Sequence, residues 1–191
     1  MLTDKRIVKT RTAIKTAFLQ LAIKNDIGKI TVSNITETAK INRSTFYLHY
    51  GDIYTVLQDI EKEIDLKISS CIDSLDISDV HNSTYTLFKN LSNTLNESPE
   101  LKNFILYSTS SKYIIGKIKD IFTEKALLTV AGIYPHVDKK TLEYVFTFTS
   151  SGIIDTYVKW EHAKDDYTSL DELIKTVSEL TQSVLEVVKM K

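Results

Sequence analysis

Glycine, proline and cysteine are scarce in this sequence. Of its 191 residues, 5 are Gly, 2 are Pro and 1 is Cys. So few turn-forming residues exclude a sandwich or barrel of many short strands and favour long helices. The single cysteine, Cys71, rules out an internal disulfide and fits a reducing compartment, so we expect a cytoplasmic protein.

Long apolar runs are also missing. No window approaches the roughly 18 consecutive apolar residues that a membrane-spanning helix needs. The N-terminal residues lack an unbroken apolar segment ahead of a small-residue cleavage site. We therefore expect neither a membrane span nor a signal peptide. With 42% apolar and 26% charged residues, the chain has the composition of a folded globular protein.

Signatures of catalysis and of metal binding are absent from the sequence. It contains no Gly-rich phosphate loop, G-x-S-x-G elbow or H-E-x-x-H helix. The four histidines stand singly, with no Cys or second His at ligand spacing. The acidic pair Asp171 and Glu172 is adjacent in sequence, and adjacent side chains on a helix point apart. The sequence predicts no enzyme, no metal site and no cofactor.

Charge is unevenly distributed along the chain, although the net charge is only −1. The first 50 residues hold nine Lys/Arg against three Asp/Glu, a local charge of +6, and the remainder holds fifteen against twenty-two, a charge of −7. Phosphate attraction depends on local charge, so this asymmetry suggests a polyanionic partner for the first segment. A basic solvated surface without a partner is the alternative that charge alone leaves open.

Helical periodicity divides the first 50 residues into three helices. Residues 5–24 carry apolar side chains at helical spacing, beginning with Ile7, and basic side chains crowd their early turns. Thr31 is then positioned to cap a second helix of about two turns. The side chain of Asn42 is positioned to cap a third helix, which we expect to run from Arg43 to about His49.

The stretch KINRSTFYLHYGD, residues 40–52, mixes aromatic and polar side chains. Phe46 and Tyr50 are four residues apart and share one helix face, whereas the polar residues fall on the other sides. A helix that lies in a DNA groove must bury one face and present hydrogen-bond donors on another. A small three-helix core with a merely polar surface is the alternative. The two-helix unit, the tight turn and the local charge together favour DNA binding.

The longer run ITVSNITETAKINRSTFYLHYGDIYTVL, residues 30–57, resembles the helix-turn-helix signature of the TetR family of bacterial transcription regulators, whose usual form is T-V-x-x-I-A-x-x-A-G-V-S-R-x-T-F-Y-x-H-F. The residues that match this pattern are Thr31, Val32, Ile35, Ala39, Arg43, Thr45, Phe46, Tyr47 and His49. The T-F-Y-x-H-aromatic ending makes the resemblance specific.

Two residues depart from the family pattern. Lys40 replaces the usual turn glycine, so we expect a left-handed conformation there at a cost on the order of 1 kcal/mol. Ile53 replaces a lysine that resembles a phosphate contact in relatives. The loss of one such contact should weaken DNA binding and make its salt dependence shallower by about one unit of slope.

The sequence predicts helices after residue 50 as well. Asp52 is positioned to cap a long helix, and Ser169 with Glu172 forms a capping-box pattern ahead of the last one. Shorter helices are expected at residues 82–96, 100–111 and 113–131, followed by long ones at 138–160 and 169–188. We therefore predict an all-α protein in which a three-helix N-terminal domain is joined by a long helix to a helical C-terminal domain.

The resemblance implies a DNA-binding domain over residues 1–50 and an effector-binding and dimerisation domain over residues 51–191. It implies a homodimer that binds a palindromic operator in double-stranded DNA, together with an unidentified small-molecule effector. The expected DNA-binding residues are Lys5, Arg6, Lys9, Thr31, Ser33, Asn42, Arg43, Ser44, Thr45, Tyr47 and His49. The aromatic residues from which an effector pocket is expected are Tyr85, Phe88, Phe104, Tyr107, Phe122, Tyr144 and Phe148. The expected dimer interface comprises Leu142, Val145, Thr149, Gly152, Ile153, Leu173, Val177, Leu180, Thr181 and Val184.

The sequence is therefore interpreted as that of a ligand-responsive transcriptional repressor. Three alternatives to a repressor stay open at this point: an activator of the same family, an interaction protein of the same fold with a degenerate DNA-binding domain, and a helical enzyme that uses the pocket.

Overall fold

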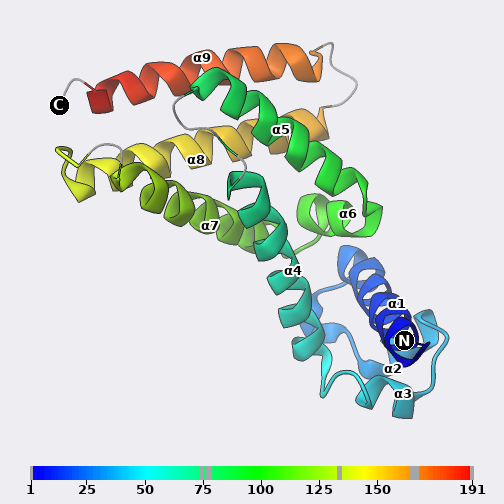
Figure 1. Cartoon of the computed structure of the whole chain (residues 1–191). Coiled ribbons are helices and arrows are strands. Elements are labelled where there is room, and N and C mark those ends of the chain that lie inside the picture. Colours follow the sequence, from blue (N-terminus) through cyan, green and yellow to red (C-terminus); the bar gives the residue numbers. More distant parts are fainter. Residues whose placement is uncertain (1, 74, 76–78, 133–134, 164–167, 190–191) are drawn as a thin grey trace. The chain divides into compact units, whose positions relative to one another are not determined.

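The computed structural model of the chain describes residues 2–73, 75, 79–132, 135–163 and 168–189. Within these ranges all regular secondary structure is helical, and no strand occurs (Figure 1). The elements are α1 (Leu2–Lys24), η1 (Ile27–Lys29), α2 (Val32–Thr38), α3 (Arg43–Tyr47), α4 (Ile53–Asp73), α5 (Val80–Asn96), α6 (Pro99–Tyr107), α7 (Ser111–Ala131), α8 (Lys139–His162) and α9 (Leu170–Lys189). The predicted all-α fold is confirmed.

The helices form two compact units. The first unit comprises residues 1–64 and 95–114, and the second comprises residues 65–94 and 115–191. Helices α1 to α3, the first half of α4 and α6 therefore belong to the first unit, and α8 and α9 belong to the second. The boundary predicted after Tyr50 separates a DNA-binding from an effector-binding domain. The two compact units do not test that functional division, so it stays a prediction.

The core of the first unit is built from residues far apart in sequence. Phe18 on α1, Phe46 on α3 and Phe104 on α6 are all fully buried. The rings of Phe18 and Phe104 meet edge to face, with centroids 6.5 Å apart. Ile7, which we expected on the same apolar face of α1, is 44% exposed. Periodicity identifies a helix face, but it does not tell how far along the helix neighbouring elements cover it.

The predicted cap by Thr31 and the predicted capping box of Ser169 and Glu172 are both present, and Thr31 proves to be part of a capping box as well. The hydroxyl of Thr31 accepts a hydrogen bond from the backbone N–H of Asn34, and the side chain of Asn34 accepts one from the backbone N–H of Thr31. At the start of α9 the Ser169 hydroxyl accepts from the N–H of Glu172, whose carboxylate accepts from the N–H of Ser169. Each box satisfies two donors that a helix start otherwise leaves unpaired.

The third helix differs in detail from its prediction. It ends at Tyr47 rather than near His49, although Leu48 keeps a helical backbone and the N–H of Tyr50 still donates to the carbonyl of Phe46 at 3.0 Å. The predicted side-chain cap by Asn42 is wrong. Asn42 has the extended backbone of a cap residue, but only its backbone carbonyl bonds to the helix, by accepting from the N–H of Phe46 at 3.1 Å.

The core of the second unit combines apolar packing with a few buried hydroxyl groups. Phe88 on α5 packs against Tyr157 on α8 with ring centroids 5.7 Å apart. The Tyr157 hydroxyl lies 3.0 Å from the hydroxyl of Ser92 and donates to Glu161 at 3.1 Å. Burial raises the pKa of Tyr157, which therefore stays protonated and acts as a neutral donor inside the unit.

Candidate nucleic-acid interface

The turn between α2 and α3 determines where the third helix begins. Lys40 has φ of 53°, the left-handed conformation expected where the family pattern has glycine. The N–H of Ile41 donates to the carbonyl of Thr36 at 3.0 Å, which closes the turn. The lysine thus keeps the turn geometry at the expense of local backbone strain.

Helix α3 presents one apolar and one polar face. Phe46 is fully buried and Tyr50, just beyond the helix, is nearly so, as predicted. Tyr47 is exposed and meets Phe46 edge to face at 5.5 Å between ring centroids. Arg43 and Ser44 project into solvent as well. Five residues are too few for an isolated stable helix, so its position depends on the contacts of Phe46 and Tyr50.

The residues predicted to bind DNA all belong to the first unit. The exposed ones are Lys5, Arg6, Lys9, Thr31, Ser33, Asn42, Arg43, Ser44 and Tyr47, and the half-buried ones are Thr45 and His49. Their assignment as DNA contacts stays a prediction.

A groove between α1 and α3 brings three of these residues together. Its lining includes Arg6 from α1 with Thr45 and His49 from residues 43–50, which we call the third-helix segment. Four lining residues were not predicted: Ile7, Thr10, Arg11 and Leu48. Leu48 is 82% exposed. Its exposure follows from the helix period, because position 48 lies between the inward positions 46 and 50.

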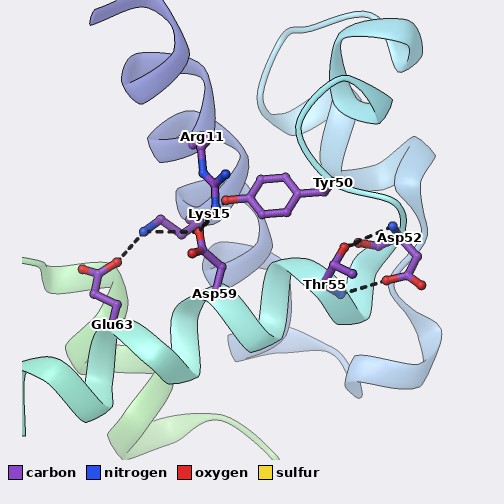
Figure 2. A network of polar contacts seen from close by, with 7 residues as sticks. All are labelled: Arg11, Lys15, Tyr50, Asp52, Thr55, Asp59 and Glu63. Carbon is purple, nitrogen blue, oxygen red and sulfur yellow. Dashed lines mark hydrogen bonds and ion pairs between the residues drawn. The ribbon is translucent and has the colours of Figure 1, made fainter. Parts of the chain in front are cut away.

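A polar network fixes the end of the third-helix segment to α1 and α4 (Figure 2). The Tyr50 hydroxyl donates to the carboxylate of Asp59 on α4 at 2.6 Å. Arg11 on α1 pairs with the same oxygen at 3.1 Å, and its guanidinium lies over the Tyr50 ring, 4.9 Å from the centroid. Lys15 lies 3.8 Å from that oxygen and bonds to the carboxylate of Glu63.

Electrostatics inside this network favour a charged carboxylate. Burial by itself would raise the pKa of Asp59, but hydrogen bonds from Tyr50 and Arg11 outweigh it and the pKa lies below its usual value. Burial, followed by the bond to Asp59, raises the pKa of Tyr50, so the phenol keeps its proton. The network therefore exists at neutral pH as a carboxylate that accepts from a neutral phenol and a guanidinium.

The start of α4 is fixed next to this network (Figure 2). The N–H of Thr55 donates to the Asp52 carboxylate at 2.8 Å, and the N–H of Asp52 donates to the Thr55 hydroxyl at 3.2 Å. The predicted capping role of Asp52 is confirmed. Ile53, which departs from the family pattern, is buried beneath this cap, so its apolar side chain belongs to the core.

The aromatic residues predicted to line an effector pocket do not gather around one pocket. Phe122 lines a cavity of about 70 Å³ in the second unit, between α4, α5, α7, α8 and α9. Phe88 is buried in the second unit and does not line that cavity, and Phe104 lies in the core of the first unit. The exposed aromatics are Tyr85, Tyr107, Tyr144 and Phe148. Among the described residues, the cavity lining is apolar apart from hydroxyl groups and carries no charge.

An apolar groove runs between α8 and α9 in the second unit. It brings together eight of the ten predicted interface residues: Val145, Thr149, Gly152, Ile153, Val177, Leu180, Thr181 and Val184. Tyr144 and Phe148 line it as well, with 65% and 67% of their surface exposed. Leu142 and Leu173 are buried in the unit and do not line it. A Cβ added to Gly152 would meet no atom within 4 Å, so a second backbone has room to approach there.

Two kinds of feature are absent from the described part of the chain. No group of three or more His, Cys, Asp or Glu side chains is arranged to hold a metal ion there. None of its helices combines the length and the apolar character needed to cross a membrane.

Comparisons with known proteins agree with this geometry. No family model matches the chain. Over 56 residues it is 48% identical to the uncharacterized HTH-type transcriptional regulator YxbF of Bacillus subtilis (strain 168), a stretch that covers 29% of this chain and only 15% of that protein.

Similarity to solved structures extends over nearly the whole chain. A TetR transcriptional regulator from Streptococcus agalactiae 2603V matches 95% of this chain and 98% of its own, with a TM-score of 0.65 and 21% identity. The fatty acid degradation regulator FadR from Bacillus halodurans matches 92% of this chain and 94% of its own, with a TM-score of 0.58 and 16% identity. The chain therefore has the fold of these TetR-family structures.

Proposed function

We propose that the protein is a ligand-responsive repressor that acts in the cytoplasm and binds a palindromic operator as a homodimer. The observation that carries this proposal is the division of α3 into two faces. Phe46 is held in the core while Arg43, Ser44 and Tyr47 face solvent, in the segment with a local charge of +6. This is the arrangement that a recognition helix needs in a major groove.

The residues of the interface divide by the contacts they can make. Lys5, Arg6 and Lys9 on α1, with Thr31, Ser33 and Tyr47, would bind phosphates and position the protein. Arg43, Ser44, Thr45 and His49 would reach base edges, with Asn42 at the start of the helix. Phosphate contacts give affinity and salt dependence, whereas base contacts give sequence preference.

Binding to the DNA upstream of the protein's own gene tests this proposal. Fluorescence anisotropy would compare that DNA with a scrambled duplex over a salt series. We expect a preference of at least about 10³-fold and a steep salt slope. A reporter under the bound promoter then separates repression from activation. Absence of any salt-sensitive DNA binding, together with capture of one stoichiometric partner protein, would instead indicate an interaction protein.

The second copy is expected on the α8–α9 groove. Tyr144, Phe148 and Leu180 expose more than half of their surface on an apolar groove, and a contiguous exposed apolar patch is typical of an interaction site. A two-fold dimer formed there would contain two symmetry-related copies of the first unit, as a palindromic operator requires. The two recognition helices should then lie about 34 Å apart. Sedimentation equilibrium of the full chain measures this association directly.

The effector is expected to place an uncharged apolar group in the cavity of the second unit. A charged group there would lose its hydration without gaining a partner among the described lining residues. The volume of about 70 Å³ is roughly half that of an engineered cavity that holds benzene, so only a short alkyl segment fits. The similar structure of FadR is that of a fatty acid degradation regulator, which agrees with an alkyl ligand.

A matched pair of probes tests this ligand class. Hexanol should raise the melting temperature of the protein and weaken operator binding, whereas hexylammonium should do neither. Ala126→Leu, on the α7 wall of the cavity, should abolish the effect of hexanol because the added carbons occupy the free volume. An equal response to both probes would contradict the assignment.

A further inference from the structure

Two of the basic side chains on α1, Arg11 and Lys15, form ion pairs inside the first unit. Five basic residues lie between residues 5 and 15, and Lys5, Arg6 and Lys9 are exposed among them. Arg11 and Lys15 differ, because both turn toward α4 and are half-buried (Figure 2). This matters for DNA binding, since any cation that meets a phosphate adds affinity for every sequence.

Arg11 stands beside the proposed DNA contacts and yet is paired. It lines the same groove as Thr45 and His49. Its guanidinium bonds to the Asp59 carboxylate at 3.1 Å and stacks on the Tyr50 ring at 4.9 Å. These two contacts direct its charge toward α4. Without them, a side chain as long as arginine would reach outward from this groove.

The acidic partners on α4 match the basic pair on α1 in spacing. Arg11 and Lys15 are one helical turn apart, and so are Asp59 and Glu63. Asp59 meets Arg11 at 3.1 Å and Lys15 at 3.8 Å, and Glu63 binds Lys15 as well. A single pair at a surface contributes little to stability, about 0 to 1 kcal/mol, so docking of α4 on α1 does not by itself require four charges.

We propose that Asp59 and Glu63 are specificity-determining residues for DNA binding, because they hold Arg11 and Lys15 away from phosphates and so limit the affinity for DNA of any sequence. This inference rests on the proposed DNA-binding function. Tyr50 has a separate, positioning role in the same network. Its hydroxyl ties the end of the third-helix segment to Asp59 and carries no charge.

The double variant Asp59→Asn/Glu63→Gln separates this role from a structural one. Asparagine keeps an oxygen that can accept from Tyr50, so the shape of the network is preserved while both negative charges are lost. We expect several-fold tighter binding to a scrambled duplex at low salt, and a salt slope steeper by about one to two units. The ratio of operator to scrambled affinity should fall. A structural role alone would weaken binding to both duplexes without steepening the slope.

Three control variants make the test specific. Arg11→Gln/Lys15→Gln in the double-variant background should return the salt slope to its original value. Glu37→Gln removes an exposed carboxylate of α2 in the same unit, which pairs with neither Arg11 nor Lys15, and should leave the slope nearly unchanged. Tyr50→Phe should lower operator affinity with no change of slope.

The outcomes distinguish this inference from the proposed function. If the unmodified protein prefers its operator but the double variant binds scrambled DNA no more tightly, only this inference is overturned. If the Glu37 variant steepens the slope as much as the double variant does, the effect is general electrostatics and the inference is again overturned. If the unmodified protein shows no salt-sensitive DNA binding, the proposed function fails and the inference fails with it.

Discussion

The third-helix segment of the first unit and the α8–α9 pair of the second are held by different kinds of contact. In the first unit, directional contacts between charged and hydroxyl groups, centred on Asp59, connect α1, the third-helix segment and α4. In the second unit, α8 and α9 meet along an apolar groove beside an apolar cavity. Polar contacts fix angles, because a hydrogen bond weakens steeply when it is misaligned. Apolar contacts are non-directional and leave room for a partner or a ligand.

This difference agrees with the task proposed for each unit. A short recognition helix has to present its donors at defined angles, so a network that fixes its end is useful there. A surface that exchanges solvent for a second copy needs apolar area, and a cavity that accepts an alkyl group needs the absence of charge. Four experiments would break or sharpen the comparison, and they follow from the largest expected effect to the smallest.

Charging the α8–α9 groove should have the largest effect. Phe148→Glu/Leu180→Glu would bury unpaired charges in the proposed dimer, at a cost of about 3 kcal/mol or more, and raise the dimer dissociation constant more than 100-fold. Both side chains are mostly exposed in the single chain, so its melting temperature should change little. Sedimentation equilibrium gives the constant. Leu128→Glu, at an exposed leucine of α7 outside the groove, is the control and should leave it unchanged.

Arg43→Ala tests the polar face of α3. If the guanidinium forks onto a guanine, operator binding should weaken by about 1 to 3 kcal/mol, roughly 5- to 150-fold. Binding to a scrambled duplex should hardly change, because the residue then makes no phosphate contact. Anisotropy titrations on the two duplexes measure this. Equal losses on both would show that Arg43 binds only a phosphate.

Lys40→Gly tests the strained turn between α2 and α3. Glycine removes the cost of the left-handed conformation but loses more chain entropy on folding, so the net stabilisation should be at most about 1 kcal/mol. Lys40→Ala keeps the strain and removes the same charge, and it should not stabilise the protein. Urea unfolding of the three proteins at neutral pH would compare their free energies. Stabilisation by alanine to the same extent would show that charge, not strain, is responsible.

Lowering the pH should weaken the network of the first unit by a small amount. The pKa of Asp59 lies below its usual value in the folded chain, so its contribution to stability is present above an unfolded pKa of about 4 and is lost as the pH falls through the folded pKa. The stability difference between the unmodified protein and Asp59→Asn should therefore shrink from pH 5 to pH 3. Urea unfolding at each pH measures it. A difference that stays constant over this range would show that the carboxylate is not the group responsible.

Several features of the interface followed from local sequence. The pairing of Thr31 with Asn34 and the cap by Asp52 depend on residues three positions apart, so the sequence contains both partners. The burial of Phe46 and Tyr50 follows from their four-residue spacing. The left-handed conformation of Lys40 was implied by the resemblance, because Lys40 stands where the family pattern has glycine. Such features are accessible because the geometry of a single helix or turn decides them.

Other features depended on contacts that no local pattern contains. Helical spacing alone does not separate Phe104, which packs on Phe18 in the first unit, from Tyr144 and Phe148, which line the α8–α9 groove. All three are among the aromatic residues from which the sequence predicts an effector pocket. The side chain of Asn42 has the right type and position for a cap, yet makes no capping bond.

By itself the sequence determined that the chain is helical, where most helices begin and end, and which face of the third helix is apolar, because these depend on residues within a few positions of one another. Only the tertiary structure decided that Arg11 meets Asp59 across 48 positions and that Ala126 and Ile153 enclose one cavity. The pattern of an amphipathic helix predicts that one of its faces is covered by another element. Which other face covers it depends on the packing of the whole unit.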